Sequence, residues 1–143
     1  MPRLSLDADV RSLGTVRAFV REESPPLGAD DVAVGDLVQA VDEWVTNVLT
    51  HGYRDRHGPV EVELAREGDD VVVRIRDRAP DFDPHAAPPF DASVPLERRR
   101  PGGMGIHLIR TLMDAMERRP RAGGGNELIL RRSGRTAATG GNR

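Results

Sequence analysis

Residues 41 to 53 read Val-Asp-Glu-Trp-Val-Thr-Asn-Val-Leu-Thr-His-Gly-Tyr. This stretch closes a predicted helix that runs from about Asp30 to Thr50. Apolar residues recur along that helix at a spacing that places them on one face, which predicts burial against a core. They are Val34, Leu37, Val38, Val41, Val45 and Val48.

Two polar residues of the same stretch are candidates for chemistry. Glu43 and Asn47 are four residues apart, so they share a helix face, roughly opposite the apolar stripe. A carboxylate there can accept a proton from a hydroxyl group, and an amide oxygen one turn later can bind Mg²⁺. Taken alone, such a pair is more often a solvated polar face, so other motifs must decide.

The flanking sequence predicts further elements on both sides. Residues 3 to 6 predict a short strand, and Asp7 or Asp9 can cap a helix whose apolar stripe is Val10, Leu13, Val16 and Val20. Pro25, Pro26 and Gly28 then break the chain. After Tyr53, residues 59 to 65 alternate as a half-buried strand does, and residues 68 to 70 turn into a second arm at 71 to 76.

The second half of the chain begins with a long loop. Residues 78 to 101 contain six prolines and a run of three arginines, and a loop of this length is functional or disordered. A helix with Ile106, Ile109, Met113 and Met116 on one side follows, and then a last strand at 127 to 132. We expect one domain over residues 1 to 132 and a flexible tail at 133 to 143. The order of elements predicts a two-layer α/β sandwich, with helices on one face of a mostly antiparallel sheet.

Two more motifs stand at element ends. Asp77 ends the predicted hairpin, where a carboxylate can accept a hydrogen bond from an adenine amino group; a simple turn residue is the alternative. Residues 101 to 106, Pro-Gly-Gly-Met-Gly-Ile, open a helix. Glycines let the backbone approach phosphate, and a helix N-terminus favours an anion, although a flexible joint would look the same. The motif is neither a Walker A loop nor a dinucleotide fingerprint.

Composition excludes several classes of site. The formal net charge is -2, so no nucleic-acid partner is expected. The 21 basic residues are all arginine, and cysteine is absent, which excludes lysine-anchored phosphate sites and cysteine-ligated metals. The histidines show no zinc-type spacing. No apolar run reaches the ~18 residues of a membrane span, so we expect a cytoplasmic protein without a membrane partner.

Taken in order, the three motifs resemble the N, G1 and G2 boxes of the GHKL ATPases. The resemblance covers about residues 4 to 132 and is nearest the small anti-sigma serine/threonine-protein kinases. Glu43 to Tyr53 is similar to their N box, Asp77 to Pro84 to their G1 box, and Gly102 to Asp114 to their G2 box. The resemblance implies a Bergerat ATP-binding fold with a mixed, mostly antiparallel sheet.

The resemblance also implies roles for individual residues. Glu43 would be the general base, Asn47 would hold Mg²⁺, and Asp77 would bind the adenine amino group. The loop from about Pro84 to Pro101 would be a lid over ATP. Contacts to the nucleotide are implied for His51, Ala79, Arg100, Gly102, Gly103, Met104, Gly105, Ile106 and Asn126. Arg98 and Arg99 could reach the phosphates with Arg100, or the three could be a solvated run.

Two residues depart from the family pattern. Ala79 replaces the first G1 glycine; if its φ must be positive, alanine costs on the order of 1 kcal/mol, and its β-carbon could crowd the adenine. A second G1 glycine is often found where Asp81 stands. Trp44 occupies a place where a small residue is common, and we expect it to pack, at a subunit or partner interface. Neither departure touches Glu43, Asn47 or Asp77.

The implied function is that of a partner-switching kinase. Such a protein binds Mg-ATP, phosphorylates a serine or threonine of an anti-anti-sigma (STAS) partner, and sequesters a sigma factor or similar regulator. A homodimer is expected by the same resemblance. The alternatives are a non-catalytic ATP-dependent binding module, the ATP-binding half of a histidine kinase, and a heat-shock or mismatch-repair ATPase, which would need further domains. Acid-stable phosphoserine on the target would distinguish the first reading from histidine phosphorylation.

Overall fold

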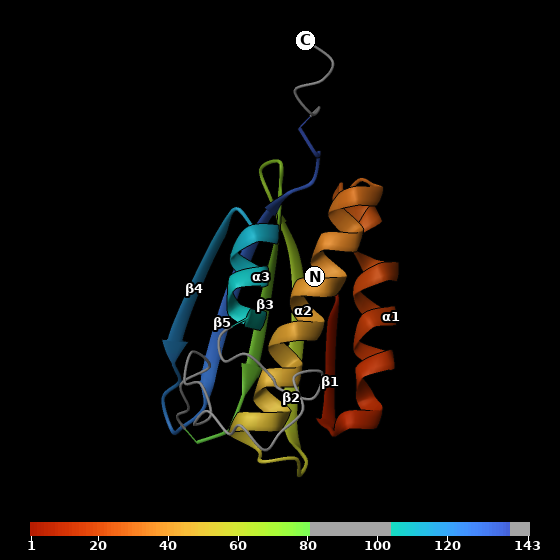
Figure 1. Cartoon of the computed structure of the whole chain (residues 1–143). Helices are drawn as coiled ribbons and strands as arrows, with labels where there is room; N and C mark the ends of the chain where they lie inside the picture. The colour runs from red at the N-terminus through yellow and green to blue at the C-terminus, as the bar shows by residue number, and fades with distance from the viewer. Residues whose placement is uncertain (81–103, 138–143) are drawn as a thin grey trace, which may run out of the picture.

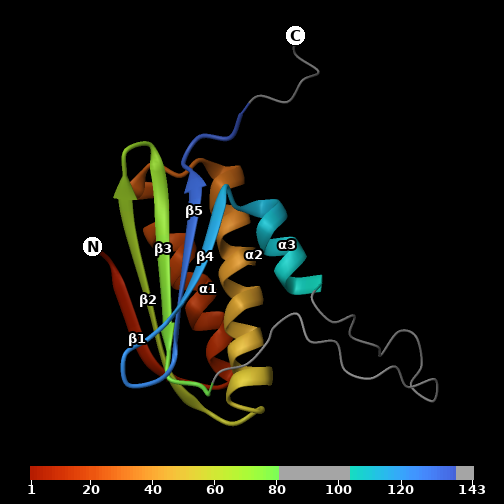
Figure 2. The same cartoon turned by 90° about the vertical axis from the view of Figure 1, so that its left-hand side faces the viewer.

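The computed structural model describes residues 1–80 and 104–137. For Met104 it describes the backbone alone. Three α-helices pack on one face of a five-stranded sheet (Figures 1 and 2). They are α1 (Leu13–Glu23), α2 (Asp31–Asn47) and α3 (Met104–Leu112). The predicted two-layer α/β sandwich is confirmed.

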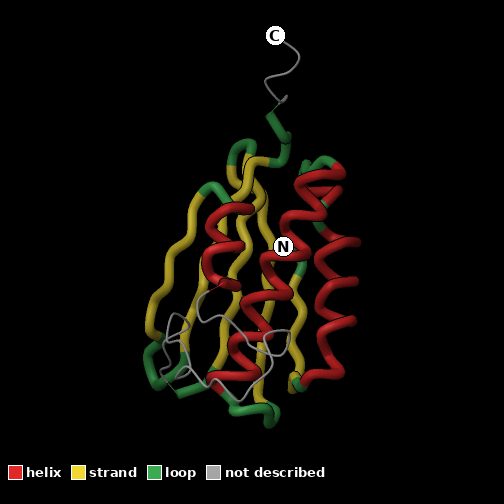
Figure 3. Tube along the Cα trace, in the orientation of Figure 1, coloured by secondary structure: helices red, strands yellow, loops and turns green. Residues whose placement is uncertain are grey.

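The strands run in the order β1-β2-β3-β5-β4. Their bounds are β1 (Arg3–Ala8), β2 (Gly58–Glu67), β3 (Asp70–Asp77), β4 (Ala115–Pro120) and β5 (Asn126–Ser133). Each of the pairings between neighbouring strands is antiparallel, as Figure 3 lets the reader follow. The predicted hairpin at 59 to 76 is β2 and β3.

The core lies between the two layers. Alternate residues of β2 and β3, such as Val62 and Ile75, face the helices and are fully buried, because side chains of a strand alternate between its two faces. The helices contribute Leu37, Val41 and Trp44, whose side chains are also fully buried. Burying each such side chain contributes roughly 1.5–3 kcal/mol, so the apolar stripes hold the layers together.

Side-chain caps start the turn before α1 and the helix α2. Asp9 caps a short 3₁₀ turn, Val10–Ser12, which leads into α1. Val10 is 72% exposed, so its predicted place on the buried stripe is wrong; the turn before α1 has a tighter period than an α-helix. Asp30 caps α2 by accepting a hydrogen bond from the Ala33 amide at 2.8 Å. At its other end, α2 continues as one π-helical turn, Val48–Gly52.

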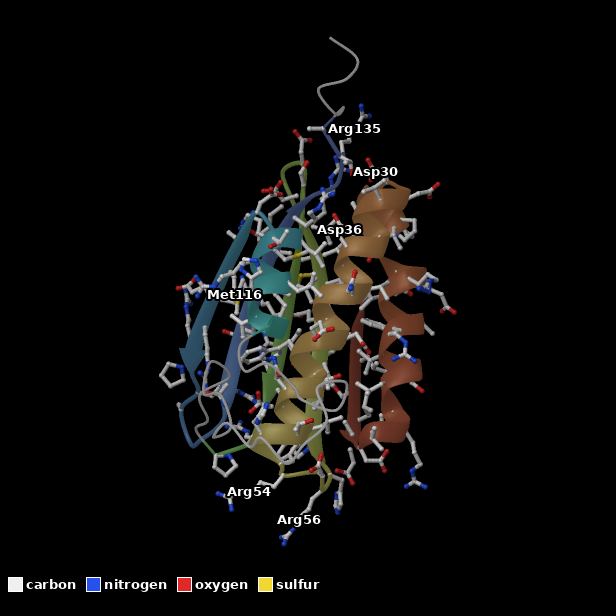
Figure 4. All side chains as sticks on the ribbon, in the orientation of Figure 1. Asp30, Asp36, Arg54, Arg56, Met116 and Arg135 are labelled. Atoms are coloured by element: carbon white, nitrogen blue, oxygen red, sulfur yellow. The ribbon has the colours of Figure 1, made fainter. Side chains whose placement is uncertain are left out.

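The helix predicted through Met116 ends earlier. α3 stops at Leu112, and Met116 lies on β4, an edge strand that the sequence analysis missed. Asp114 makes the corner: its amide donates to the Arg131 carbonyl at 2.8 Å, and its carboxylate accepts from the Ser133 amide at 2.6 Å. Figure 4 shows Met116 on the sheet beside α3.

The segment after β5 is bonded to the rest of the domain. The Asp30 amide donates to the Gly134 carbonyl (2.7 Å), and the Thr136 amide and hydroxyl donate to the Asp30 carboxylate at 2.6 and 2.8 Å. Figure 4 shows Asp30, Asp36 and Arg135 gathered at this end of the molecule. The structure thus differs from the predicted tail boundary for residues 133–137, while 138–143 lie outside the described residues.

The sheet face that no helix covers is charged. On it, Arg76 pairs with Glu63 at 3.1 Å, with Glu127 at 2.7 Å and with Glu61. These pairs lie across neighbouring strands, where opposite charges stabilise a sheet. Within residues 1–80 and 104–137, no helix is long and apolar enough to cross a membrane.

Candidate functional site

The motifs meet at one end of the molecule, the lower end in Figure 1. There α2 and β3 end and β4 turns into β5. The N-terminal turn of α3 packs on the C-terminal half of α2, which brings Gly105 against Glu43 and Asn47. The same fold places Asp77, at the end of β3, beside Asn126 on β5.

The Glu43 and Asn47 side chains lie in the interface between α2 and α3. A β-carbon on Gly105 would come within 2.9 Å of the Glu43 Oε2 atom and 3.6 Å of the Asn47 Nδ2 atom. Both side chains are half-buried, and Asn47 Nδ2 is a buried donor without a partner among the described residues. The pair therefore lies at a contact between two helices rather than on an open helix face.

Asp77 is a fully buried carboxylate with one oxygen satisfied and one not. Its Oδ1 atom accepts hydrogen bonds from the Ala79 amide at 2.9 Å and from Asn126 Nδ2 at 3.2 Å. Its Oδ2 atom has no donor in the described part of the chain. Burial raises the pKa of the Asp77 carboxyl above its usual value, while these hydrogen bonds act in the opposite direction. A buried acceptor without a donor is costly, so its presence here points to a ligand donor.

Ala79 fits this site without backbone strain. Among the described non-glycine residues, only Arg54 and Asp55 have positive φ, so the strain considered for Ala79 does not arise. Pro80 favours an extended backbone at the residue before it. In that conformation the Ala79 amide reaches Asp77, and its methyl group is fully buried.

A cavity of about 590 Å³ opens beside Asp77. Its lining combines apolar surface with cationic side chains and comes from the end of β3, from β4 and from the β4–β5 turn. The lining residues are Arg78, Ala79, Pro80, Arg118, Pro120, Arg121, Gly124, Gly125 and Asn126. The volume is within the range of small-molecule sites.

The β4–β5 turn is fixed tightly to the end of β3. Gly125 has a φ of +99°, and a β-carbon there would lie 2.1 Å from the Asp77 carbonyl oxygen, so glycine is required. Arg121 Nη1 donates to that carbonyl at 2.8 Å, and Arg78 Nη1 donates to the Gly124 carbonyl at 2.6 Å. The sequence analysis missed Arg78, Arg118 and Arg121; the glycine run at 123 to 125 was the available signal.

The remaining N-box residues have other roles. The Tyr53 hydroxyl donates to the Pro59 carbonyl at 2.7 Å and accepts from the Arg78 amide at 2.8 Å, which ties the loop after α2 to β3. His51 is exposed on the π-helical turn. Trp44 is fully buried within the core, so its prediction as packing is confirmed and its place at a subunit or partner interface is wrong.

Part of the predicted phosphate site cannot be compared. The lid from 84 to 101, the arginines at 98 to 100, Gly102 and Gly103 lie outside the described residues. Met104 begins α3. Ile106 is 1% exposed and belongs to the core. The described residues contain no group of three or more acidic, histidine or cysteine side chains able to hold a metal ion by themselves.

Comparison with known proteins identifies related chains. Residues 6–132 match the family model of the histidine kinase-like ATPase domain. The anti-sigma F factor of Clostridium beijerinckii is 34% identical over 82% of this chain and 80% of that protein, and the one of Clostridium kluyveri is 30% identical over the same shares. The serine-protein kinase RsbW of Halalkalibacterium halodurans is 31% identical over 84% of this chain and 76% of that protein.

A solved structure has the same fold. The crystal structure of the RsbU and RsbW domains of a Mycobacterium tuberculosis protein superposes with a TM-score of 0.61 at 24% identity. The match covers 93% of this chain and 32% of that one. It supports the two-layer architecture described above.

Proposed function

Because this chain belongs to the histidine kinase-like ATPase family, we propose that it is an ATP-dependent protein serine/threonine kinase and anti-sigma factor. The single observation that carries the nucleotide site is the Oδ2 atom of Asp77, a buried acceptor without a donor among the described residues. The Asp77 carboxylate is bonded to Ala79 and Asn126, which line the cavity. An adenine amino group is a donor of the right kind. The relatives named anti-sigma F factor and serine-protein kinase support the activity.

Glu43 is the proposed general base. Its carboxylate lies on the face of α2 against the N-terminal turn of α3, and that turn is where backbone amides can hold phosphate. The carboxylate accepts the proton of the attacking serine or threonine hydroxyl, so the oxygen can form its bond to phosphorus while the bond to ADP breaks. The rest of catalysis is positioning.

Asn47 is the proposed protein ligand of Mg²⁺. Its side chain lies one turn from Glu43, beside Gly105, and a lone amide ligand fits a cation that takes its other ligands from phosphate oxygens and water. The bound cation would neutralise phosphate charge during transfer. Asn47 fits this role because its amide oxygen is a ligand type that Mg²⁺ accepts and because its side chain lies beside the turn proposed to hold phosphate.

The proposed partners are an anti-anti-sigma protein, as phosphate acceptor, and a sigma factor or similar regulator, as the sequestered client. Competition between them would make phosphorylation a switch, because weakening one complex shifts the population of the other. A homodimer remains our expectation, and light scattering on the purified protein measures it. A protein that binds ATP and its partners without turnover is the second candidate, and Glu43 is what argues against it.

The first test replaces Glu43 with glutamine or alanine. Both variants should bind ATP as the unmodified chain does, while phosphotransfer to a cognate partner falls by about 10²–10⁴-fold, the usual contribution of a general base. Calorimetry measures binding, and radiolabel transfer measures the rate. The product should be acid-stable phosphoserine or phosphothreonine.

The control for this test is Glu22→Gln, which removes a carboxylate from α1. Its transfer rate should be unchanged. A normal rate in Glu43→Gln would remove Glu43 from the chemistry. An unmodified chain that binds ATP but transfers no phosphate would instead favour the non-catalytic binding module.

A further inference from the structure

Three side chains from three neighbouring strands form a hydrogen-bonded row beside the cavity. Arg118 on β4 donates from Nη2 to the Asn126 Oδ1 atom on β5 at 3.1 Å, and Asn126 Nδ2 donates to Asp77 Oδ1 on β3 at 3.2 Å. Asn126 is 3% exposed and Asp77 is fully buried. The row therefore connects the edge strand to the centre of the adenine site.

The guanidinium group of Arg118 is held in place from a second side. Its central carbon lies 5.8 Å from the centroid of the Trp44 ring, and Trp44 is buried on α2. A cation over an indole face is attracted by the ring. Arg118 thus lies between the core of the helix layer and the polar row, and also lines the cavity.

The chemistry of the row fixes its direction. Arginine has donors and no acceptor, so Asn126 must turn its amide oxygen toward Arg118. The amide nitrogen then faces Asp77 and satisfies Oδ1, and Oδ2 is left for another donor. Without Arg118, only Asp77 holds the orientation of the Asn126 side chain, so the Asn126 amide can turn away and leave Asp77 Oδ1 with one donor fewer.

We propose that Arg118 is a positioning residue for base recognition, which orients Asn126 so that Asp77 offers one carboxylate oxygen to the amino group of adenine. This inference rests on the proposed nucleotide site. In this proposal, the three residues of the row together make the site prefer a purine with an amino group at position 6. A purine with a keto group there would bring its oxygen against the Asp77 Oδ2 atom, and two acceptors repel. Arg118 acts through Asn126 rather than on the reacting atoms.

The charge of Arg118 acts in the same direction. Burial raises the pKa of the Asp77 carboxyl, and the positive charge of Arg118 opposes that rise. Other groups around Asp77 are Arg121, which donates to its backbone carbonyl, and Tyr53 and Arg78, which are bonded to each other. Loss of Arg118 should therefore leave Asp77 protonated up to a higher pH, and a protonated carboxyl accepts poorly.

The test measures binding of ATP and of inosine triphosphate, which has a keto group at position 6, to the full chain and to Arg118→Met. The unmodified chain should prefer ATP. In the variant, ATP affinity should fall about tenfold, as for loss of an oriented hydrogen bond to a charged group, while affinity for inosine triphosphate changes little. The variant's ATP affinity should recover as pH rises, because ionisation restores the acceptor.

Two further variants separate positioning from general damage. Arg118→Lys keeps a donor and should retain most of the ATP preference. Asn126→Thr carries a hydroxyl that can rotate to donate to Asp77 without guidance, so adding Arg118→Met to it should cost much less than tenfold. Arg119→Met, on the opposite face of β4 where Arg119 pairs with Glu117 at 3.0 Å, is the matched control.

The outcomes distinguish this inference from the proposed function. If the unmodified chain binds neither nucleotide, the nucleotide site itself is wrong. If it binds ATP and Arg118→Met has the same ATP preference and the same pH profile, the positioning role is overturned while the site stands. If Arg118→Met does not fold, Arg118→Ala replaces it in the Asn126 and the Asn126→Thr backgrounds. Equal losses of ATP affinity in the two backgrounds overturn the proposal.

Discussion

At the scale of single residues, Asp77 combines two demands that oppose each other. In the proposed site it recognises a base away from water and is therefore buried, and burial of a carboxylate disfavours its charged form. The Ala79 amide and Asn126 donate hydrogen bonds to Oδ1, which offsets part of this cost. Oδ2 has no donor among the described residues, so the rest of the cost remains. In the proposed site, the amino group of the ligand would bond to this Oδ2 atom and offset the remaining cost.

The first residue-scale prediction concerns Asp77→Asn. The variant should lose most of its affinity for adenine nucleotides, because its amide nitrogen would meet the amino group donor to donor. Calorimetric titration with ATP measures this loss. Unchanged ATP affinity would remove Asp77 from the site.

The stability of the same variant has a pH dependence with a defined sign. The folded-state pKa of Asp77 is raised, so the folded protein binds more protons than the unfolded chain between the two pKa values, and stability falls as pH rises through that window. Asp77→Asn cannot titrate. Relative to the unmodified chain, its free energy of unfolding should therefore increase with pH across that window, as measured by urea unfolding from pH 4 to 8; a constant difference would contradict the raised pKa.

Sequence reasoning located Glu43, Asn47 and Asp77 because each belongs to a local motif. It missed Arg118 and Arg121 because their roles depend on the pairing of β4 with β5, which a local pattern does not contain. The strain considered for Ala79 depended on a positive φ angle at that residue. Pro80, the next residue, restricts the backbone of Ala79 to extended conformations, and the sequence already contained this signal.

At the scale of elements, the site depends on how closely α3 approaches α2. A β-carbon at Gly105 would lie 2.9 Å from the Glu43 Oε2 atom, so the Glu43 carboxylate would have to shift. Two helices pack at the distance that their contact side chains permit. The glycine of this motif thus serves the packing of Glu43 as well as any phosphate contact.

The element-scale prediction compares Gly105→Ala with Gly35→Ala. Gly35 lies in α2 with no atom within 4 Å of an added β-carbon, so alanine there should stabilise the protein by up to ~1 kcal/mol and leave activity unchanged. Gly105→Ala gains similar helix propensity but must displace Glu43. Its melting temperature should change little while phosphotransfer falls at least about tenfold, since misplacement near 1 Å can cost more.

Thermal unfolding and transfer assays on the two variants decide this. Equal activity in both would mean that Gly105 tolerates a methyl group and that Glu43 has room to move.

β4 shows why one element escaped prediction. Met113 and Met116 are three residues apart, which imitates a helical stripe continued from Ile106 and Ile109. The strand itself, Ala115–Pro120, has two arginines, a glutamate and a proline in six residues, and so carries little strand propensity. Edge pairing with β5 and the corner at Asp114 override the local pattern. The other strands alternate over longer stretches, and their positions were predictable.

At the scale of the whole molecule, the two ends of the sandwich differ in what they hold. One end carries the candidate site. At the other, residues Gly134 and Thr136 join the start of α2 to the end of β5 through Asp30, and Arg132 reaches Asp36 at 2.9 Å. Figure 4 shows Arg54 and Arg56 at the end opposite Asp30 and Asp36.

The whole-molecule prediction is that a chain ending at Arg132 is less stable than one ending at Ala137. It loses the bonds of Gly134 and Thr136 to Asp30 and Asp69, which together should contribute about 2 kcal/mol at this partly exposed site. Differential scanning calorimetry should show a melting temperature lower by about 5–10 °C. ATP affinity, tested at a temperature where both chains are folded, should be equal. Equal melting temperatures would show that these bonds contribute nothing.

The contact between Trp44 and Arg118 has an optical consequence. The chain has one tryptophan. Trp44 is fully buried in the core, and the Arg118 guanidinium lies over its ring. Its ultraviolet emission is consequently a signal from a single known place. An event that moves β4 against α2 changes the surroundings of that one fluorophore, so the protein can be followed in solution without an attached dye.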